Sequence, residues 1–265
     1  MSVNRLSQAL KGCLHSRLPF LVPPLRRGRR IAQAMWPAAS RKLRRLPLLG
    51  RVRSLALDRG HRQLVFEEIL RENRWGDADS QSGVGSNRLC SESVGAELPL
   101  LLEAFAFRSM LDIPCGDFFW MRLLTLELDY VGGDIVPQLV ERNQRLFGGE
   151  RRHFVRMDIV CDRLPTVDLV LCRDCLVHLS HEDALRALSN VKRSGSSYLL
   201  TTTFVDRQSN RDIRTGDWRP LNLRLPPFGL APPLRLIDEK EPQEGFRDKN
   251  LGLWRVSDLP EYRRT

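Results

Sequence analysis

No stretch of eighteen or more apolar residues occurs in the 265-residue sequence, so we expect no helix that spans a membrane. The N-terminal region also lacks the pattern of a secretory signal, because arginine and proline interrupt each of its apolar stretches. Both absences favour an intracellular protein, which we expect in the cytoplasm.

The six cysteines lack the spacing of a zinc site. Cys172 and Cys175 form a lone Cys-x-x-Cys, and no second pair of ligands at similar spacing accompanies them. Most of the cysteines fall inside expected strands or turns, which is typical of reduced thiols in an intracellular protein. We therefore expect reduced thiols and no metal site.

Aspartate and glutamate are absent from residues 1–57, which contain 13 lysine and arginine residues and carry a charge of +13. Five prolines interrupt this segment, which we call the basic arm: Pro19, Pro23, Pro24, Pro37 and Pro47. In the rest of the chain, the other 29 of the 42 bases face 32 acids, a net charge of −3. The high overall pI is therefore due to the arm alone. A high pI suggests binding to nucleic acid, and here that inference applies only to the arm.

Three interpretations of the basic arm remain open. Its composition is typical of a poorly ordered tail or a loosely packed helical hairpin. It is also typical of an organelle transit peptide, in which case the protein would lie in an organelle matrix. Alternatively, the arm contacts anionic lipid or a nucleic acid through its basic side chains: Arg26, Arg27, Arg29, Arg30, Arg41, Lys42, Arg44 and Arg45.

The chain is organised around residues 109–130. Residues 110–113 are apolar for most of their length and have the flanks of a short buried strand. Pro114, Gly116 and Asp117 then favour a tight turn, and residues 118–126 are compatible with a helix. This order would place backbone N–H groups and a helix N-terminus at the carboxyl edge of a parallel sheet, where open α/β sheets bind nucleotides.

A second strand is expected at residues 130–136, and it contains a carboxylate near its end. Asp134 follows Asp112 by 22 residues, close to the offset of about 20 residues at which a βαβ nucleotide fold places its ribose-binding acid. The turn at residues 114–117 reads Pro-Cys-Gly-Asp and lacks the Gly-x-Gly-x-x-Gly pattern of dinucleotide-dependent enzymes. An oxidoreductase with a related fold is therefore disfavoured.

The series of acids along the chain resembles that of the class I S-adenosylmethionine (SAM)-dependent methyltransferases. Four landmarks of the family occur in order over residues 109–204: motif I (Asp112 and Gly116), the acid after strand two (Asp134), the acid after strand three (Asp158), and strand four with its exit loop (residues 168–179). Weaker landmarks extend to residue 256. The sequence departs from the family at the motif I turn, which usually carries two or three glycines.

The resemblance implies SAM as the cofactor. Its implied binding residues come from motif I, from the two acids that follow strands two and three, from the strand-four exit loop and from an upstream loop: Asp112, Pro114, Cys115, Gly116, Asp117, Asp134, Ile135, Asp158, Ile159, Arg173, Gly83 and Gly85. In this family the segment before motif I often closes the cofactor pocket. Residues 80–86 are therefore expected to form a flap, with a plain connector as the alternative.

Each of these residue types suits its implied role. Asp134 can accept hydrogen bonds from both ribose hydroxyls of SAM. Asp158 can accept from the adenine amino group, with Ile159 packed on the ring. Gly116 permits close approach of the backbone to the methionine moiety.

The acceptor side of the reaction depends on the exit loop of strand four. Asp174 and His178 are four residues apart, so on a helical turn they share one face, and His178 can serve as a general base for a hydroxyl acceptor. A structural histidine at the strand exit is the alternative. The loop lacks the Asn/Asp-Pro-Pro-aromatic sequence that is common in enzymes methylating amide or exocyclic amino nitrogen. We therefore expect transfer to oxygen of a small molecule, a glycan or a lipid-linked acceptor.

The alternation of strands and helices predicts a doubly wound, mostly parallel, seven-stranded Rossmann-like sheet with helices on both faces. Helices are expected at residues 58–74, 92–105, 118–126, 137–146 and 182–192. Strands are expected at residues 110–113, 130–136, 153–159, 167–172, 198–204, 234–238 and 251–256. One domain, residues 58–265, would then comprise a helical lead-in and flap (58–108), a cofactor-binding core (109–204), a proline-rich substrate lid (205–233) and closing strands (234–265).

Two other functions remain as alternatives to a methyltransferase for small molecules. An RNA methyltransferase would use the basic arm as a tether and would bind RNA in a salt-sensitive manner. A non-catalytic partner protein with the same fold is the second, because the motif I turn departs from the family pattern.

Overall fold

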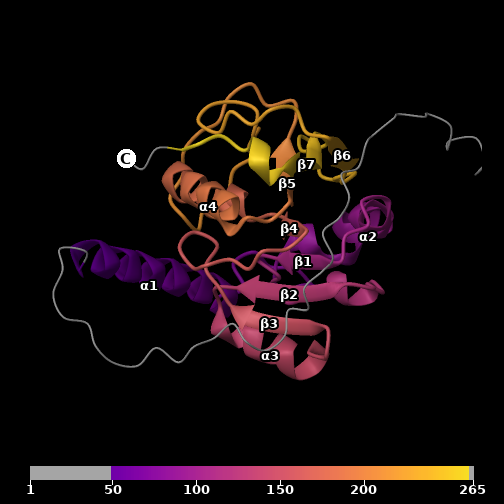
Figure 1. Ribbon diagram of the computed structural model, residues 1–265, viewed down its shortest axis with the longest axis horizontal. Helices are drawn as coiled ribbons and strands as arrows, with labels where there is room; N and C mark the ends of the chain where they lie inside the picture. The colour runs from indigo at the N-terminus through magenta and orange to yellow at the C-terminus, as the bar shows by residue number, and fades with distance from the viewer. Residues whose placement is uncertain (1–48, 263–265) are drawn as a thin grey trace, which may run out of the picture. The chain divides into compact units, whose positions relative to one another are not determined.

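The computed structural model describes residues 49–262, and their side chains from residue 58 onward (Figure 1). The three interpretations of the basic arm concern residues that lie outside this range, apart from 49–57. These nine residues form the first turns of helix α1, so the helical region begins earlier than the predicted boundary at residue 58. In the described part of the chain, no helix is long and apolar enough to cross a membrane.

Seven strands and four α-helices make up the described domain. The helices are α1 (Leu49–Arg71), α2 (Arg88–Ala104), α3 (Pro137–Phe147) and α4 (His181–Ser194). The strands are β1 (Ser109–Asp112), β2 (Asp129–Asp134), β3 (Arg152–Arg156), β4 (Leu169–Cys172), β5 (Tyr198–Phe204), β6 (Arg235–Asp238) and β7 (Lys249–Arg255). Short 3-10 turns lie at Val84–Ser86, Met121–Leu123, Leu176–His178 and Val256–Asp258.

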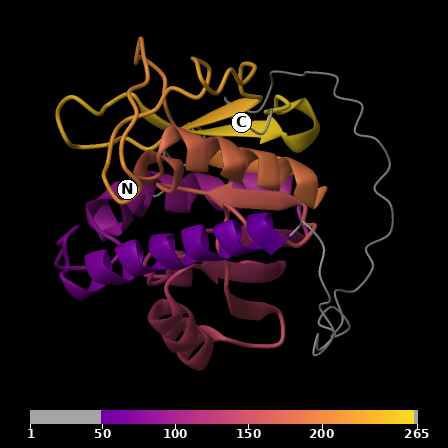
Figure 2. The same ribbon diagram turned by 90° about the vertical axis from the view of Figure 1, so that its left-hand side faces the viewer.

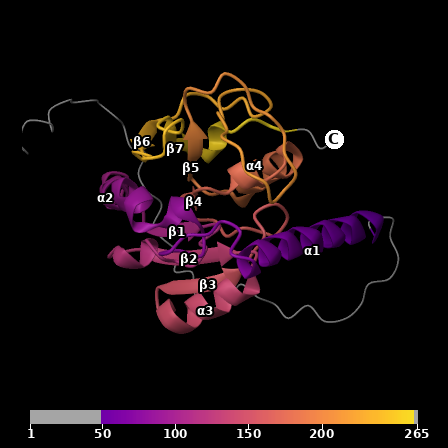
Figure 3. The same ribbon diagram turned by 180° about the vertical axis from the view of Figure 1, so that it is seen from behind.

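The strands form one sheet in the order β3-β2-β1-β4-β5-β7-β6, with β3 and β6 at its edges (Figures 1 and 3). Neighbours among β1 to β5 pair in parallel, whereas β7 is antiparallel to both β5 and β6. The predicted sheet is therefore confirmed, including its closing antiparallel pair. Since β1 and β4 are adjacent while β2 and β3 lie beyond β1, the connections change direction between β1 and β4, which is where open α/β sheets bind ligands.

Apolar side chains alternate between the two faces of the central strands, and each set is covered by helices. Leu111, Val170 and Leu199 are paired across β1, β4 and β5 and pack in one core with α4 and the Phe66 side of α1. Figure 2 shows α1 and α4 lying together over this face. Their neighbours Met110 and Leu169 point to the opposite face, against α2 and part of α3. This alternation explains why short strands with nearly continuous apolar sequence are buried on both sides.

The helix predicted at residues 118–126 is wrong. Only a single 3-10 turn forms there, at Met121–Leu123. Phe118 has a φ angle of +60°, which ends any regular helix at the motif I turn, and its ring is buried among Tyr130, Phe147 and Phe154. Packing of the aromatic ring has overridden the local helix preference. No helix N-terminus therefore follows motif I, and the ligand-binding edge depends on the backbone turn alone.

Residues 205–233 contain no helix or strand, in agreement with the predicted proline-rich excursion. The segment is tied to the exit of β4 by backbone hydrogen bonds from Gly216 to His178 (2.8 Å) and from Arg219 to Val177 (3.1 Å). These bonds bring Trp218 to the carboxyl edge of the sheet. Its role as a substrate lid remains a prediction.

Candidate active site

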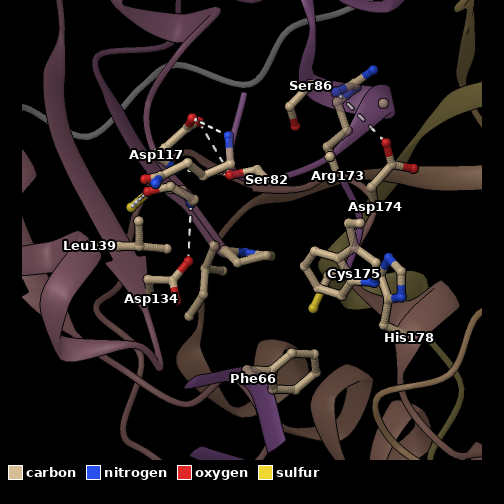
Figure 4. Close-up of a pocket in the computed structure, with 18 of the residues that line it drawn as sticks. Phe66, Ser82, Ser86, Asp117, Asp134, Leu139, Arg173, Asp174, Cys175 and His178 are labelled. Atoms are coloured by element: carbon tan, nitrogen blue, oxygen red, sulfur yellow. Dashed lines mark hydrogen bonds and ion pairs between the residues drawn. The ribbon is translucent and has the colours of Figure 1, made fainter. Parts of the chain in front are cut away.

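A pocket of about 330 Å³ lies at the carboxyl ends of β1, β2 and β4. All fourteen residues predicted from the sequence to bind the cofactor or act in catalysis line this pocket. Figure 4 shows Asp134, Asp117 and Ser82 on one side, with Asp174, Cys175 and His178 on the other. The structure therefore brings the predicted set together, while the role of each residue remains a prediction.

The motif I turn is held against the end of β2 by the carboxylate of Asp134. Its Oδ2 accepts a hydrogen bond from the Gly116 N–H at 3.0 Å, and its Oδ1 accepts from the Val136 N–H at 2.9 Å. The φ angle of Gly116 is +54°, and a Cβ there would collide with the Ser82 hydroxyl oxygen. A single glycine thus meets both requirements of the turn: left-handed backbone and close approach of the neighbouring loop.

Two buried carboxyl groups at this turn hold protons more tightly than usual. Burial raises the pKa of Asp134 to about 6, although the N–H groups of Val136 and Gly116 oppose the shift. Burial also raises the pKa of Asp112 to about 7, and the Tyr130 hydroxyl, which donates to Asp112 at 2.6 Å, opposes it. Both carboxyl groups line the pocket and therefore titrate there close to the physiological range.

The upstream loop predicted as a flap is tied to the motif I turn. The carboxylate of Asp117 accepts from the Ser80 hydroxyl (3.0 Å), the Gln81 N–H (2.8 Å) and the Ser82 hydroxyl (3.2 Å). Further along, a Cβ on Gly85 would lie 2.6 Å from Oδ2 of Asp174, so this glycine lets the loop approach the opposite wall. The loop therefore contacts both walls of the pocket, and its role as a flap remains a prediction.

The acid after β3 is paired with a residue that the sequence did not suggest. Arg62 of α1 donates to Oδ2 of Asp158 from Nε at 3.0 Å and from Nη2 at 2.9 Å, and to Asp183 of α4 at 3.1 Å. Oδ1 of Asp158 accepts from the Val160 N–H at 2.9 Å. Arg62 is 3% exposed and lines the pocket. Helix α1 therefore forms part of the site, as well as covering the sheet.

Asp174, at the exit of β4, is held in a strained backbone conformation. Its φ angle is +49°, and its N–H donates to the Thr202 hydroxyl at 2.8 Å. The Lys249 ammonium lies 2.8 Å from Oδ2. Burial alone would raise the pKa of Asp174, but the charges of Lys249 and Arg173 lower it to about 2. Strain of this kind in a non-glycine residue is typical of functional positions.

Arg173 and Lys249 belong to a buried cluster of charges at one end of the pocket. Arg173 binds Glu239 at 2.5 Å, and Lys249 lies 3.3 Å from Glu239 and 3.7 Å from Glu241. Together with Asp174, the cluster holds two cations and three carboxylates. Its members use most of their polar atoms on one another, which fixes Arg173 and Asp174 in place.

His178 lies between an aromatic ring and a backbone carbonyl. Its Nδ1 is 3.0 Å from the Asp217 carbonyl oxygen, and its ring centroid is 4.4 Å from that of Trp75. Because a carbonyl oxygen can only accept, this contact assigns the hydrogen of the neutral ring to Nδ1 and leaves the lone pair on Nε2. Burial lowers the pKa of His178 to about 4, so the ring is neutral at pH 7.

The cysteines of the described chain are free thiols. Cys175 lines the pocket, and Cys172 is buried at the end of β4. Among the described residues, no group of three or more histidine, cysteine, aspartate or glutamate side chains is arranged to hold a metal ion.

Several residues that line the pocket could not be foreseen from the sequence. They come from segments far from the predicted motifs: Arg62, Phe66, Trp75, Trp218, Phe246 and Lys249. Only Trp218 lies in a segment that was predicted to cover the site, the lid at residues 205–233. For Arg62 and Lys249 no local signal exists, because their positions depend on how α1 and β7 dock.

No family model matches the sequence, and no curated protein matches it. Among solved structures, the chain is similar to the N-methyltransferase NodS from Bradyrhizobium japonicum in complex with S-adenosylhomocysteine (SAH), with 17% identity, a TM-score of 0.43, and coverage of 52% of this chain and 72% of that one. It is also similar to human N-acetylserotonin methyltransferase in complex with SAM, with 15% identity, a TM-score of 0.45, and coverage of 79% and 60%. An O-methyltransferase family protein from Burkholderia thailandensis has 15% identity, a TM-score of 0.40, and coverage of 49% and 47%.

The strand order of the chain itself shows its fold. Five parallel strands with the order 3-2-1-4-5, closed by an antiparallel β7 between β5 and β6, define the class I SAM-dependent methyltransferase fold. The chain has this fold.

Proposed function

We propose that the chain is a SAM-dependent methyltransferase that transfers a methyl group to oxygen of a small-molecule, glycan or lipid-linked acceptor. The observation that carries the proposal is the junction of Asp134 with the Gly116 turn. It joins the carboxyl ends of β1 and β2, next to the switch point between β1 and β4, and lines the same pocket as the loop at residues 80–86.

Asp134 and Asp158 both have lone pairs left that can accept hydrogen bonds from a nucleoside. Asp134 accepts hydrogen bonds from the backbone N–H groups of Gly116, Val136 and Ile135, and a carboxylate offers about four lone-pair sites. One site remains for a ribose hydroxyl. Oδ2 of Asp158 accepts both hydrogen bonds from Arg62, whereas Oδ1 accepts only the one from the Val160 N–H. Oδ1 therefore has one lone pair left to accept a hydrogen bond from the adenine amino group.

The exit of β4 provides a group that can accept the proton that a hydroxyl loses when its oxygen is methylated. When bound, SAM supplies an activated methyl group, and transfer to a hydroxyl oxygen releases one proton. His178 is neutral, and its Nε2 has a free lone pair, so this nitrogen is the proton acceptor in our proposal. The rest of the site positions the reactants and excludes water, which is most of what methyl transfer requires of a protein.

Thermal unfolding with added ligands tests the proposal. A ligand present at a hundred times its dissociation constant stabilises the folded protein by about 2.7 kcal/mol. This corresponds to a rise in Tm of roughly 5–11 °C for a domain of this size. We expect such a rise with millimolar SAM or SAH and none with NAD. If neither SAM nor SAH raises the Tm, or if NAD raises it more, the proposal is wrong.

A further inference from the structure

We propose that the acceptor is a planar aromatic compound with a ring hydroxyl, which binds between Trp75 and Trp218 with the hydroxyl directed at His178. The inference rests on the proposed function and narrows its acceptor class. It depends on the end of the pocket away from Asp134, where aromatic side chains from four separate segments meet. We call Trp75, His178, Phe204, Trp218 and Phe246 the aromatic end of the pocket.

Three rings of the aromatic end, those of Phe204, Trp218 and Phe246, pack edge to face on one another. The centroid of Trp218 lies 5.0 Å from that of Phe246 and 6.1 Å from that of Phe204, with interplanar angles of 85° and 82°. Phe204 is buried at the end of β5 and anchors the group. T-shaped pairs of this kind fix each ring, so a flat ligand meets preformed walls.

Trp218 is the part of this end that remains available to a ligand. It is 38% exposed while lining the pocket. It also directly follows Asp217, whose carbonyl oxygen holds Nδ1 of His178 at 3.0 Å. The bond that fixes the histidine therefore also fixes the position of the tryptophan beside it. The ring of Trp75 packs against the same histidine at an interplanar angle of 35°, with ring centroids 4.4 Å apart.

The polar groups near the aromatic end disfavour a sugar. Lys249 contacts Asp174, Glu239 and Glu241, so its ammonium group is occupied by these carboxylates. A sugar brings several hydroxyls, and each would need a partner on burial. An aromatic ring with one hydroxyl needs only one, and Nε2 of His178 supplies it.

The basicity of His178 favours a ring hydroxyl over an aliphatic one. Burial lowers the pKa of His178 to about 4, whereas a phenolic hydroxyl has a pKa of about 10. The proton affinity of an aliphatic alkoxide is far higher still. Proton transfer to so weak a base is therefore much less unfavourable from a phenol than from an aliphatic alcohol.

Calorimetric titration of three probes into the full-length protein, with and without saturating SAH, tests the inference. The probes are 2-naphthol, its saturated counterpart trans-decahydro-2-naphthol, and methyl β-D-glucopyranoside. We expect 2-naphthol to bind about tenfold or more tightly than the saturated probe, because each aromatic contact adds to simple area burial. The glucoside should bind most weakly.

Variants of Trp218 locate the binding to the aromatic end. Trp218→Ala should weaken 2-naphthol about tenfold, and Trp218→Phe should restore most of the affinity. Leu234→Ala is the control, since Leu234 is 39% exposed and does not line the pocket. The inference is overturned if 2-naphthol does not bind, or if it binds no more tightly than its saturated counterpart or the glucoside. It is also overturned if Trp218→Ala has no effect on the binding of 2-naphthol. Titration of SAH alone separates these outcomes from failure of the proposed function.

Discussion

Removal of the Arg62 guanidinium should destabilise the protein far more than removal of any arginine on the exposed side of α1. Arg62 makes three hydrogen bonds of 2.9–3.1 Å to Asp158 and Asp183, and its side chain is 4% exposed against 3% for Asp158. Arg62→Met would leave both carboxylates without their buried cation. Loss of one partner of a buried pair costs about 3–5 kcal/mol, which corresponds to a fall in Tm of roughly 6–20 °C for a domain of this size.

Arg71→Met is the matched control on the same helix. Arg71 lies 3.7 Å from Glu68 and 3.8 Å from Glu72, but its side chain is 72% exposed. Exposed pairs contribute less than about 1 kcal/mol. Urea unfolding of both variants gives the two free energies of unfolding. The double variant Arg62→Met with Asp158→Asn should recover part of the loss, because it removes one of the stranded charges. A cost below about 1 kcal/mol for Arg62→Met would refute the argument that α1 is locked to the site by this ion pair.

Three further predictions concern titration and space in the pocket. The folded-state pKa of Asp112 is about 7 against an ordinary 3.8, so its contribution to stability is fully present below about pH 4 and is lost as pH rises through 7. Asp112→Asn should therefore gain stability over the wild type at pH 8, by roughly 2–4 kcal/mol in urea unfolding, and lose this advantage at pH 4. Protonation of Asp134, which has a pKa of about 6, should weaken SAM binding, so kcat/KM should fall below pH 6. His178 has a pKa of about 4 and stays neutral to lower pH, so kcat should persist to lower pH. Parallel pH profiles of kcat and kcat/KM would contradict cofactor binding by Asp134 and proton acceptance by His178. Gly85→Ala would place a Cβ 2.6 Å from the carboxylate after β4 and should weaken SAM binding about tenfold, whereas Gly149→Ala, with no atom within 4 Å of the added Cβ, should leave it unchanged.

The sheet could be predicted from the sequence because its strands are indicated by residues that lie close together along the chain. Strand β4 is a continuous apolar run, and β5 begins and ends where the sequence indicates, at Tyr198–Phe204. The acids that end β2 and follow β3 occur at the offsets that a βαβ unit requires. Parallel pairing then brings them to one edge, so the pocket-lining set could be named before the fold was known.

Contacts that depend on packing could not be predicted. Arg62 meets Asp158 across 96 residues of sequence, and Lys249 meets Asp174 across 75. Both distances are fixed by how α1 and β7 dock on the sheet, and no local pattern encodes them. The error at residues 118–126 has the same origin, because burial of the Phe118 ring decides the backbone conformation there.

In our proposal, SAM binds at the junction of Asp134 and Gly116. Isothermal titration of SAM and SAH into the purified protein tests this most directly, beside Asp134→Ala and the control Asp129→Ala. Asp129 lies at the other end of the same strand, in a partly exposed pair with Arg151. We expect micromolar binding that Asp134→Ala abolishes and Asp129→Ala preserves. Absence of binding at millimolar SAM, or equal binding by both variants, would contradict it.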